Sequence, residues 1–340
     1  MKILVTGGCG FVGSCIALFL KRKNNKFKIS TLDNLTRKGS LVNLKRLKKS
    51  GIKNYNIEIA NYKKFSKLEK FDFIIDCCAE ASVEASREEI DKVFKTNLVG
   101  TFNVLKKCIK DNAGLIFLSS SRVYSLKALN NYKKLLGKNL SNMKTIDENF
   151  STQSPRTIYG FTKLASEEII KEFSYLFGLK FIINRFGVIS GPWQFGKQDQ
   201  GFCSLWLWSY INKKSLKYIG YGGTGRQIRD ILHIDDVCNL MSIQIKNFTK
   251  KNNMLFNLGG GKKNAISLKE LSKKCENLTN RKIKIIKQKN TSIYDIPYYV
   301  SNNQKAKKIY NWNPKKNIDE VLLDMFNWMN KNNRKIKKYF

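Results

Sequence analysis

The sequence has 340 residues, of which 42% are hydrophobic and 12% aromatic, and its formal net charge is +37 at pH 7. This apolar content is sufficient for a substantial core, and no apolar stretch is long enough to span a bilayer. The lysines are dispersed, so the charge favours a solvated surface over a nucleic-acid or membrane-surface site, and the run over 331–338 is typical of a solvated chain end. The eight cysteines lack zinc-like spacing, which predicts reduced thiols, no metal site and a cytoplasmic protein.

The chain opens with a short apolar run over 2–6 that predicts a strand and leaves no room for a signal peptide. Gly7, Gly10 and Gly13 follow at once and lead into a predicted helix over 11–21. Gly7 permits a tight turn, Gly10 lets backbone approach a pyrophosphate, and Gly13 lets the helix pack on the sheet. The pattern therefore predicts a dinucleotide site.

Asp33 follows a second predicted strand over 28–32 and lies twenty residues beyond Gly13. A carboxylate at that place accepts both ribose hydroxyls of an adenosine and repels a 2′-phosphate. Asp33 thus favours NAD over NADP, while the nearby Arg37 and Lys38 keep NADP open as an alternative.

Strands and helices continue to alternate, which predicts an α/β fold with a Rossmann-type doubly wound parallel sheet. The further predicted strands cover 56–59, 73–77, 115–118, 180–184, 254–258 and 282–288, and the further helices cover 88–110, 155–177 and 317–330. We expect residues 1–185 to form the NAD-binding domain, with the chain returning to it near 230–260. Residues 186–340 are expected to form mainly a smaller C-terminal substrate-binding lobe.

Tyr159 and Lys163 stand four residues apart on the helix predicted over 155–177, so their side chains lie on one face. A cation held beside a phenol stabilises phenolate, which can accept a proton from an alcohol. The same spacing occurs at Tyr210 and Lys214, but only the first pair follows a probable helix start and a nucleotide-binding pattern. Alcohol oxidation is the chemistry that this pair indicates.

With these motifs the sequence resembles the extended short-chain dehydrogenase/reductase family of nucleotide-sugar epimerases and dehydratases over essentially its whole length. The motifs that carry the resemblance are Thr6 to Gly13, Asn97 to Thr101, Leu118 to Tyr124, Tyr159 with Lys163, and Arg229 to Asp236. Asp33 to Gly39 and Gln194 to Gly201 are most similar to the CDP-paratose 2-epimerase branch of that family.

The resemblance implies a set of functional residues. Ser120 would bind the reacting sugar oxygen, with Ser119 and Ser121 as alternatives, Tyr159 would be the base, and Lys163 would bind the nicotinamide ribose. The residues expected to bind NAD are Gly7, Gly10, Phe11, Val12, Asp33, Asn34, Asn61, Tyr62, Cys78, Ala79, Asn97, Tyr159 and Lys163. The residues expected to bind substrate are Ser120, Gln194, Gln200 and Arg229.

The activity that the resemblance implies is epimerisation of a nucleotide-diphosphate sugar through a transient keto-sugar and NADH, at C2 of a CDP-linked dideoxyhexose or at C4. The related 4,6-dehydratases carry an Asp-Glu pair directly after the reactive hydroxyl, where this chain has Ser121 and Arg122. Dehydration is therefore disfavoured. A catalytically silent nucleotide-binding protein is a further alternative, against which Ser120, Tyr159 and Lys163 together argue.

Several positions depart from the family pattern. The second diphosphate-binding arginine is replaced by Ser292, so Lys197 or Arg226 is expected to assist Arg229, and Val188 stands where the family often has asparagine.

Other residues keep two readings. His233, the only histidine, is interpreted as structural rather than catalytic, and Glu80 as substrate-facing polarity rather than an acid. Asn97 either holds the Tyr159 helix or is an ordinary helix-face amide. Trp193, Trp206 and Trp208 are expected in the lobe core rather than stacked on a base. The family further implies a homodimer through the helices near 88–110 and 155–177.

Overall fold

The computed structural model describes residues 1–81, 89–137, 144–197 and 200–340, which form two compact units. Unit 1 comprises residues 1–123, 157–185 and 237–256, and unit 2 comprises residues 124–156, 186–236 and 257–340. The segment 124–156 thus belongs to unit 2, although it lies inside the range expected for the first domain.

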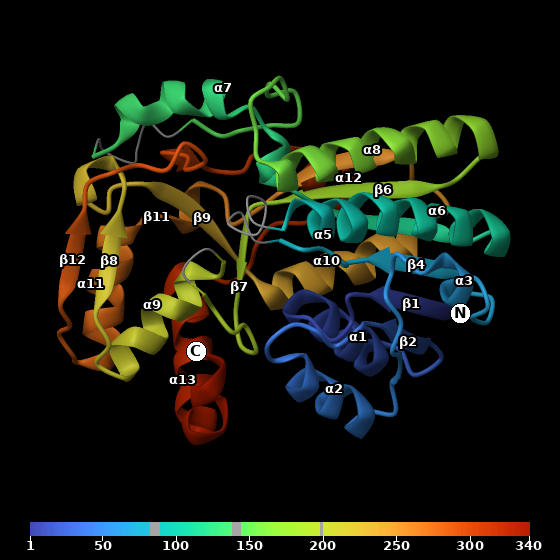
Figure 1. Cartoon of the computed structure of the whole chain (residues 1–340), viewed down its shortest axis with the longest axis horizontal. Helices are drawn as coiled ribbons and strands as arrows, with labels where there is room; N and C mark the ends of the chain where they lie inside the picture. The colour runs from blue at the N-terminus through green and yellow to red at the C-terminus, as the bar shows by residue number, and fades with distance from the viewer. Residues whose placement is uncertain (82–88, 138–143, 198–199) are drawn as a thin grey trace. The chain divides into compact units, whose positions relative to one another are not determined.

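The largest sheet has seven strands in the order β10-β6-β5-β4-β1-β2-β3 (Figure 1). Its strands are β1 (Lys2–Thr6), β2 (Lys28–Leu32), β3 (Lys53–Tyr55), β4 (Phe73–Asp76), β5 (Gly114–Ser120), β6 (Phe181–Phe186) and β10 (Met254–Leu258). β1 pairs in parallel with both β2 and β4, β2 with β3, and β4 with β5. The strand order reverses at β1, which confirms the predicted Rossmann-type fold and places its switch point between β1 and β4.

The strand predicted over 56–59 is wrong, because the chain has already turned there. β3 ends at Tyr55, and the Ile57 N–H donates to the Tyr55 carbonyl. β3 is an edge strand, so its side chains need not be apolar, whereas Ile59 after it is buried in the core. The apolar pattern therefore marked core-filling residues next to the strand rather than the strand itself.

The helices of unit 1 are α1 (Phe11–Lys23), α2 (Ser40–Lys49), α3 (Tyr62–Phe65), α5 (Ile90–Phe94), α6 (Gly100–Asp111) and α8 (Ile158–Phe177), with most of α10 (Ile234–Asn247). The helix predicted over 88–110 consists of α5 and α6 joined by a π-helix, Lys95–Val99, while Glu88 lies outside the described residues. α8 begins three residues later than predicted, because the Thr157 hydroxyl accepts the Gly160 N–H and caps the helix. α6 and α8 run side by side (Figure 1).

Unit 2 contains two smaller sheets and their helices. Its strands are β7 (Val188–Ser190), β8 (Leu216–Ile219), β9 (Ile228–His233), β11 (Ala265–Ser267), β12 (Ile285–Gln288) and β13 (Tyr298–Tyr299). Its helices are α7 (Leu126–Asn130), α9 (Phe202–Ile211), α11 (Leu268–Thr279), α12 (Gln304–Tyr310) and α13 (Ile318–Ile336). β12 and α13 lie at the positions predicted for them, and α13 extends six residues further than expected.

Each unit has its own apolar core. The core of unit 1 is formed by strand side chains such as Leu4 and Phe117 with helix side chains such as Ile170. In unit 2, Trp206 and Trp208 are buried with α11 and α13, and Trp193 packs against the same cluster. The tryptophans therefore belong to the core, as predicted.

All eight cysteines are free thiols. Within the described residues, no helix combines the length and the apolar character needed to cross a membrane.

Candidate active site

The glycine turn after β1 brings backbone very close to the start of α1. Gly7 has a φ of +59°, Gly10 caps α1, and the Gly10 N–H donates to the Gly7 carbonyl. A Cβ atom on Gly13 would lie 2.4 Å from the Gly7 oxygen, so a side chain there would push α1 away from the turn. The amide groups of the first turn, which includes Phe11 and Val12, form the positive end of a helix dipole suited to a phosphate.

Asp33 directly follows β2 and is held by two backbone donors. Its Oδ2 accepts the Cys9 N–H at 2.9 Å, and its Oδ1 accepts the Leu35 N–H at 2.8 Å. Burial raises the pKa of the Asp33 carboxyl above its usual value, and these hydrogen bonds oppose that shift. Each carboxylate oxygen keeps a further lone pair, so ribose hydroxyls can still donate to it.

Further residues expected at the cofactor follow β2, β3 and β4 of the same sheet. The Asn34 side chain donates to Glu58, Asn61 caps α3, and the Tyr62 ring lies under the Lys106 ammonium. Cys78 and Ala79 follow β4, and the Cys78 N–H donates to Thr6 and Asp76. Together with the glycine turn, these residues would hold a dinucleotide. A Cβ on Gly10 would meet only the Gly7 oxygen, so the turn leaves room for a pyrophosphate.

Three successive serines at the end of β5 differ in what their hydroxyls do. Ser119 is buried, and its Oγ donates to Glu167 Oε1 at 2.5 Å. Ser120 is the last residue of β5, and its Oγ accepts the Arg122 N–H at 3.1 Å. The Ser120 hydroxyl hydrogen is therefore free to be donated, whereas that of Ser119 is already used. This difference favours Ser120 as the reactive serine.

Tyr159 and Lys163 lie on the buried face of α8. The Lys163 ammonium donates to the Leu118 carbonyl at 2.9 Å and lies 4.4 Å from the centre of the Phe117 ring. Two of its three donors remain for a ligand. Within the described residues, the Tyr159 hydroxyl makes no hydrogen bond, so it is available to a substrate.

Asn97 connects α8 to the loop that follows β4. It lies in the π-helix, where its side chain accepts the Glu80 N–H at 2.7 Å and donates both to the Glu80 carbonyl and to Thr162 Oγ1. π-helical segments are frequent at functional sites. The Glu80 carboxylate itself lies 3.6 Å from Arg37 and 3.8 Å from Lys92, which makes it an ion-paired group rather than a free acid.

The second Tyr/Lys pair has a different environment. Tyr210 is buried in the core of unit 2, and burial raises its pKa to about 12. A phenol with a raised pKa is a poor base at neutral pH. Tyr210 is therefore unsuited to act as the base.

The residues expected to bind substrate, apart from Ser120, lie in unit 2. The Arg229 guanidinium donates to Asp295 at 3.2 Å and to the Ile296 carbonyl at 2.6 Å. Gln194 is engaged within its own loop, where its Oε1 accepts the Ser190 hydroxyl. Gln200 pairs with Lys197 through backbone hydrogen bonds, and Lys197 and Arg226 are both exposed.

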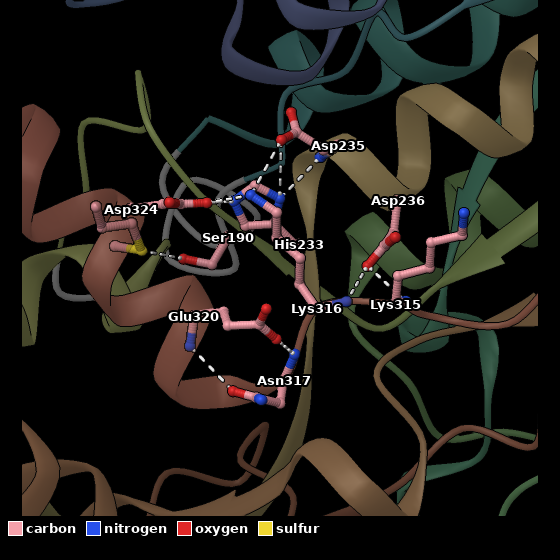
Figure 2. A network of polar contacts seen from close by, with 10 residues as sticks. Ser190, His233, Asp235, Asp236, Lys315, Lys316, Asn317, Glu320 and Asp324 are labelled. Carbon is pink, nitrogen blue, oxygen red and sulfur yellow. Dashed lines mark hydrogen bonds and ion pairs between the residues drawn. The ribbon is translucent and has the colours of Figure 1, made fainter.

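His233 ends β9 at the centre of an ion-pair network (Figure 2). Its Nδ1 accepts the Asp235 N–H at 3.1 Å, and its Nε2 lies 3.5 Å from Asp324 on α13. The Lys316 ammonium binds Asp324 and lies 3.3 Å from Asp235. Burial lowers the pKa of His233, so the imidazole is neutral at pH 7. These contacts agree with the predicted structural role.

His233, Asp235 and Asp324 also form the one group among the described residues with the spacing of metal ligands. Because Nδ1 accepts a hydrogen bond, the neutral ring carries its proton on Nε2 and has no lone pair there for a metal. The Lys316 ammonium already forms ion pairs with both carboxylates. The geometry therefore favours an ion-pair network over a metal centre.

Sequence reasoning missed a buried ion pair next to the serines at the end of β5. Glu167 on α8 and Arg185 on β6 form a buried ion pair, and Glu167 also accepts the Ser119 hydroxyl. The available signal was the position of Glu167, four residues after Lys163 and therefore on the same helix face.

Comparison with known proteins shows the same fold in a solved structure and a match to one protein family. Residues 3–259 match the model of the NAD dependent epimerase/dehydratase family. CDP-paratose 2-epimerase of Salmonella typhi is 28% identical, over 96% of this chain and 99% of its own length, and UDP-glucuronate 4-epimerase of Thermodesulfobacterium geofontis is 28% identical over 98% of each. The crystal structure of UDP-glucose 4-epimerase from Thermotoga maritima with UDP-glucose has a TM-score of 0.82 and 25% identity, over 98% of this chain and 99% of that one.

The lowered pKa of His233 predicts how stability depends on pH. The unfolded state binds a proton near the ordinary histidine pKa of about 6.5, while the folded state resists protonation to a lower pH. Stability contributed by His233 is therefore complete above about pH 6.5 and is lost as the pH falls below it. We expect His233→Asn, whose amide oxygen can still accept the Asp235 N–H, to show a weaker pH dependence of unfolding between about pH 6.5 and 5.5.

All five tryptophans lie in unit 2, so urea unfolding followed by tryptophan fluorescence reports on this unit. Burial raises the pKa of the neighbouring Asp236 and His233 opposes that shift, so the difference between the two profiles reports His233 together with its effect on Asp236. Equal slopes for the wild type and the variant would contradict a neutral buried histidine.

Proposed function

The chain belongs to the NAD-dependent epimerase/dehydratase family, and from this premise we propose that it is an epimerase of a nucleotide-diphosphate sugar. The observation that carries the proposal is the environment of β5 and α8. A serine with a free hydroxyl hydrogen, a tyrosine with no hydrogen bond to a described residue and a buried lysine are placed on two packed elements of the same unit as the glycine turn.

The proposed reaction assigns one task to each side chain. Ser120 donates a hydrogen bond to the reacting sugar oxygen, since the Arg122 N–H already occupies a lone pair of its Oγ. Tyr159, as phenolate, accepts the proton of the same sugar hydroxyl, and Lys163 supplies the adjacent positive charge. NAD, held by the glycine turn and Asp33, would supply the hydride acceptor for the sugar carbon and the hydride donor for the ketone. Tyr159 returns its proton to the ketone oxygen after the sugar has presented its other face, so the centre is inverted without net oxidation.

The two residues after Ser120 favour epimerisation over dehydration. Loss of water needs an acid as well as a base, and the 3-10 turn after β5 carries Ser121 and Arg122 at the two positions concerned. Glu80, the other carboxylate considered, is ion-paired. A catalytically silent protein would not need Ser120, Tyr159 and Lys163 together.

For the substrate, we propose a CDP-linked dideoxyhexose epimerised at C2, with a UDP-sugar epimerised at C4 as the alternative. The first is supported by similarity to CDP-paratose 2-epimerase, and the second by similarity to UDP-glucuronate 4-epimerase and UDP-glucose 4-epimerase. Gln194, Gln200 and Arg229 of unit 2 are the proposed substrate contacts. Arg229 suits a diphosphate because its guanidinium has five fixed donors. The eight cysteines form no disulfide, which suits a cytoplasmic enzyme.

The test combines cofactor extraction with product analysis. Purified protein is denatured, and the released nucleotide is identified by mass spectrometry, with NAD expected and NADP contradicting the role of Asp33. The native protein is then incubated with CDP-paratose, UDP-glucuronate and UDP-glucose, and the sugars are followed by NMR. Inversion at a single carbon supports the proposal. A product that has lost water would show a dehydratase, and no conversion by NAD-loaded protein would favour the silent alternative.

Tyr159→Phe is expected to retain NAD and lose turnover by roughly 10²-fold or more, because the proton acceptor is removed without loss of the ring. Tyr210→Phe is the matched control, since it deletes the same atom from the other tyrosine of the same spacing. The control should keep near-normal turnover on the sugar that the wild type converts. Near-normal turnover of Tyr159→Phe would exclude this mechanism.

We also propose that the enzyme is a homodimer. Seven of the twelve exposed large apolar side chains of the described residues lie on α5, the π-helix, α6 and α8; they are Ile90, Val99, Phe102, Phe161, Tyr175, Leu176 and Phe177. The Phe161 ring on α8 contacts Phe94 on α5, and the Phe102 ring on α6 contacts Phe173 on α8. The apolar surface therefore extends from α5 and α6 onto α8. Such a concentration is typical of a surface covered by a protein partner.

Phe102→Lys is expected to shift the protein from dimer to monomer in size-exclusion chromatography with light scattering, because it places a charge in the apolar surface. Leu41→Lys is the control, since Leu41 is an exposed apolar residue of unit 1 on α2, outside that surface. A monomeric wild type, or a Phe102→Lys variant that remains dimeric, would contradict the proposed interface.

A further inference from the structure

We infer that Ser119 and Glu167 are positioning residues that set the register between β5 and α8, and thereby the position of Ser120 relative to Tyr159 and Lys163. The inference rests on the proposed function, since it concerns the alignment of the groups that would carry that reaction. It assigns no contact with substrate to either residue.

Three successive turns of α8 contact the end of β5 or the 3-10 turn after it through backbone or polar atoms. Glu167 accepts the Ser119 hydroxyl at 2.5 Å, and Lys163 donates to the Leu118 carbonyl at 2.9 Å. At the start of the helix, a Cβ on Gly160 would lie 2.1 Å from the Arg122 carbonyl oxygen, so only glycine permits this approach. The reactive serine thus lies in a segment whose neighbours on both sides are held to one helix face.

The position of the Glu167 side chain is fixed because its carboxylate is ion-paired with Arg185. Its carboxylate is fully buried and accepts Arg185 Nε at 3.0 Å and Nη2 at 2.6 Å. Arg185 lies on β6, the neighbour of β5 in the sheet. A buried carboxylate separated from its guanidinium would be strongly destabilised, so α8 is held to β6 and, through Ser119, to β5.

Directional contacts of this kind determine register in a way that apolar packing does not. Apolar side chains of similar volume tolerate small displacements, whereas a hydrogen bond weakens steeply with distance and angle. Tyr159 needs this constraint, since its hydroxyl has no hydrogen bond to another described residue. Its place is therefore set by the backbone of α8. A displacement of about 1 Å at reacting groups can lower turnover by roughly 10²-fold.

Ser119→Ala tests the inference, because it removes the hydroxyl and leaves the Glu167–Arg185 pair intact. We expect kcat on the sugar nucleotide converted by the wild type to fall by roughly 10- to 100-fold, with KM and NAD content unchanged. In protein labelled with isotope-enriched tyrosine, the NMR resonance of the Tyr159 ring should also shift. That resonance is assigned by its absence from Tyr159→Phe.

Two further variants separate positioning from stability. Asn103→Ala removes another buried side chain of unit 1 that makes one hydrogen bond, from its Nδ2 to the Ile59 carbonyl. It should lower the melting temperature to a similar extent while leaving kcat and the Tyr159 resonance unchanged. Ser119→Thr keeps a hydroxyl donor for Glu167 and should recover most of the lost kcat and the wild-type resonance.

The inference is overturned if Ser119→Ala matches Asn103→Ala in kcat and in the Tyr159 resonance. If Ser119→Ala fails to fold, Ser119→Cys keeps the side-chain shape with a weaker donor, and the same two measurements decide. Absence of turnover by the wild type on every sugar tested would contradict the proposed function instead, and the Tyr159 resonance would still decide whether Ser119 positions α8.

Discussion

The packing of α8 against the carboxyl end of β5 is the constraint on which the proposed chemistry depends. α8 presents Tyr159 and Lys163, and β5 ends at Ser120. The same helix is tied to the loop after β4 through Thr162 and Asn97. Since residues at the ends of β1, β2 and β4 are those expected at the cofactor, α8 connects the acid–base groups to the cofactor-binding edge of the sheet. A displacement of α8 would therefore change the positions of the acid–base groups and of the cofactor-binding edge relative to each other.

The parts of the site that follow from local backbone requirements could be predicted from the sequence. Gly7 and Gly13 are needed because the tight turn and the close approach of α1 leave no room for a Cβ, and Gly10 keeps its backbone open to a pyrophosphate; these needs act within a few residues. Asp33 lies directly after β2, as predicted, because its position depends only on where that strand ends. Apolar periodicity likewise identified the central strands, which are buried on both faces.

The parts that depend on distant partners could not be predicted. β3 is polar because it lies at a sheet edge, and nothing in its three residues indicates which strand it pairs with. Glu167 and Arg185 are eighteen residues apart, and each alone has the appearance of a surface charge. Only the fold shows that they neutralise each other inside unit 1.

The large positive charge has little bearing on two buried ion pairs, in each of which one cation contacts one carboxylate. Lys107 with Asp111 and Arg185 with Glu167 are each buried pairs, as desolvation requires. The excess lysines therefore belong mainly to the solvated surface, where screening reduces their effect beyond about 10 Å.

The Arg229 pair with Asp295 has a consequence for substrate binding. Because the Arg229 guanidinium is bound to the Asp295 carboxylate, the positive potential that it presents to a diphosphate is reduced. The same contact fixes the orientation of the planar guanidinium. A diphosphate carries more than one negative charge, so Arg229 alone would leave it incompletely neutralised. Because Ser292 stands where the resemblance implies a second arginine, we propose that another cation of unit 2 assists Arg229. The exposed Lys197 and Arg226 are the candidates, since neither is bound to Asp295 as Arg229 is.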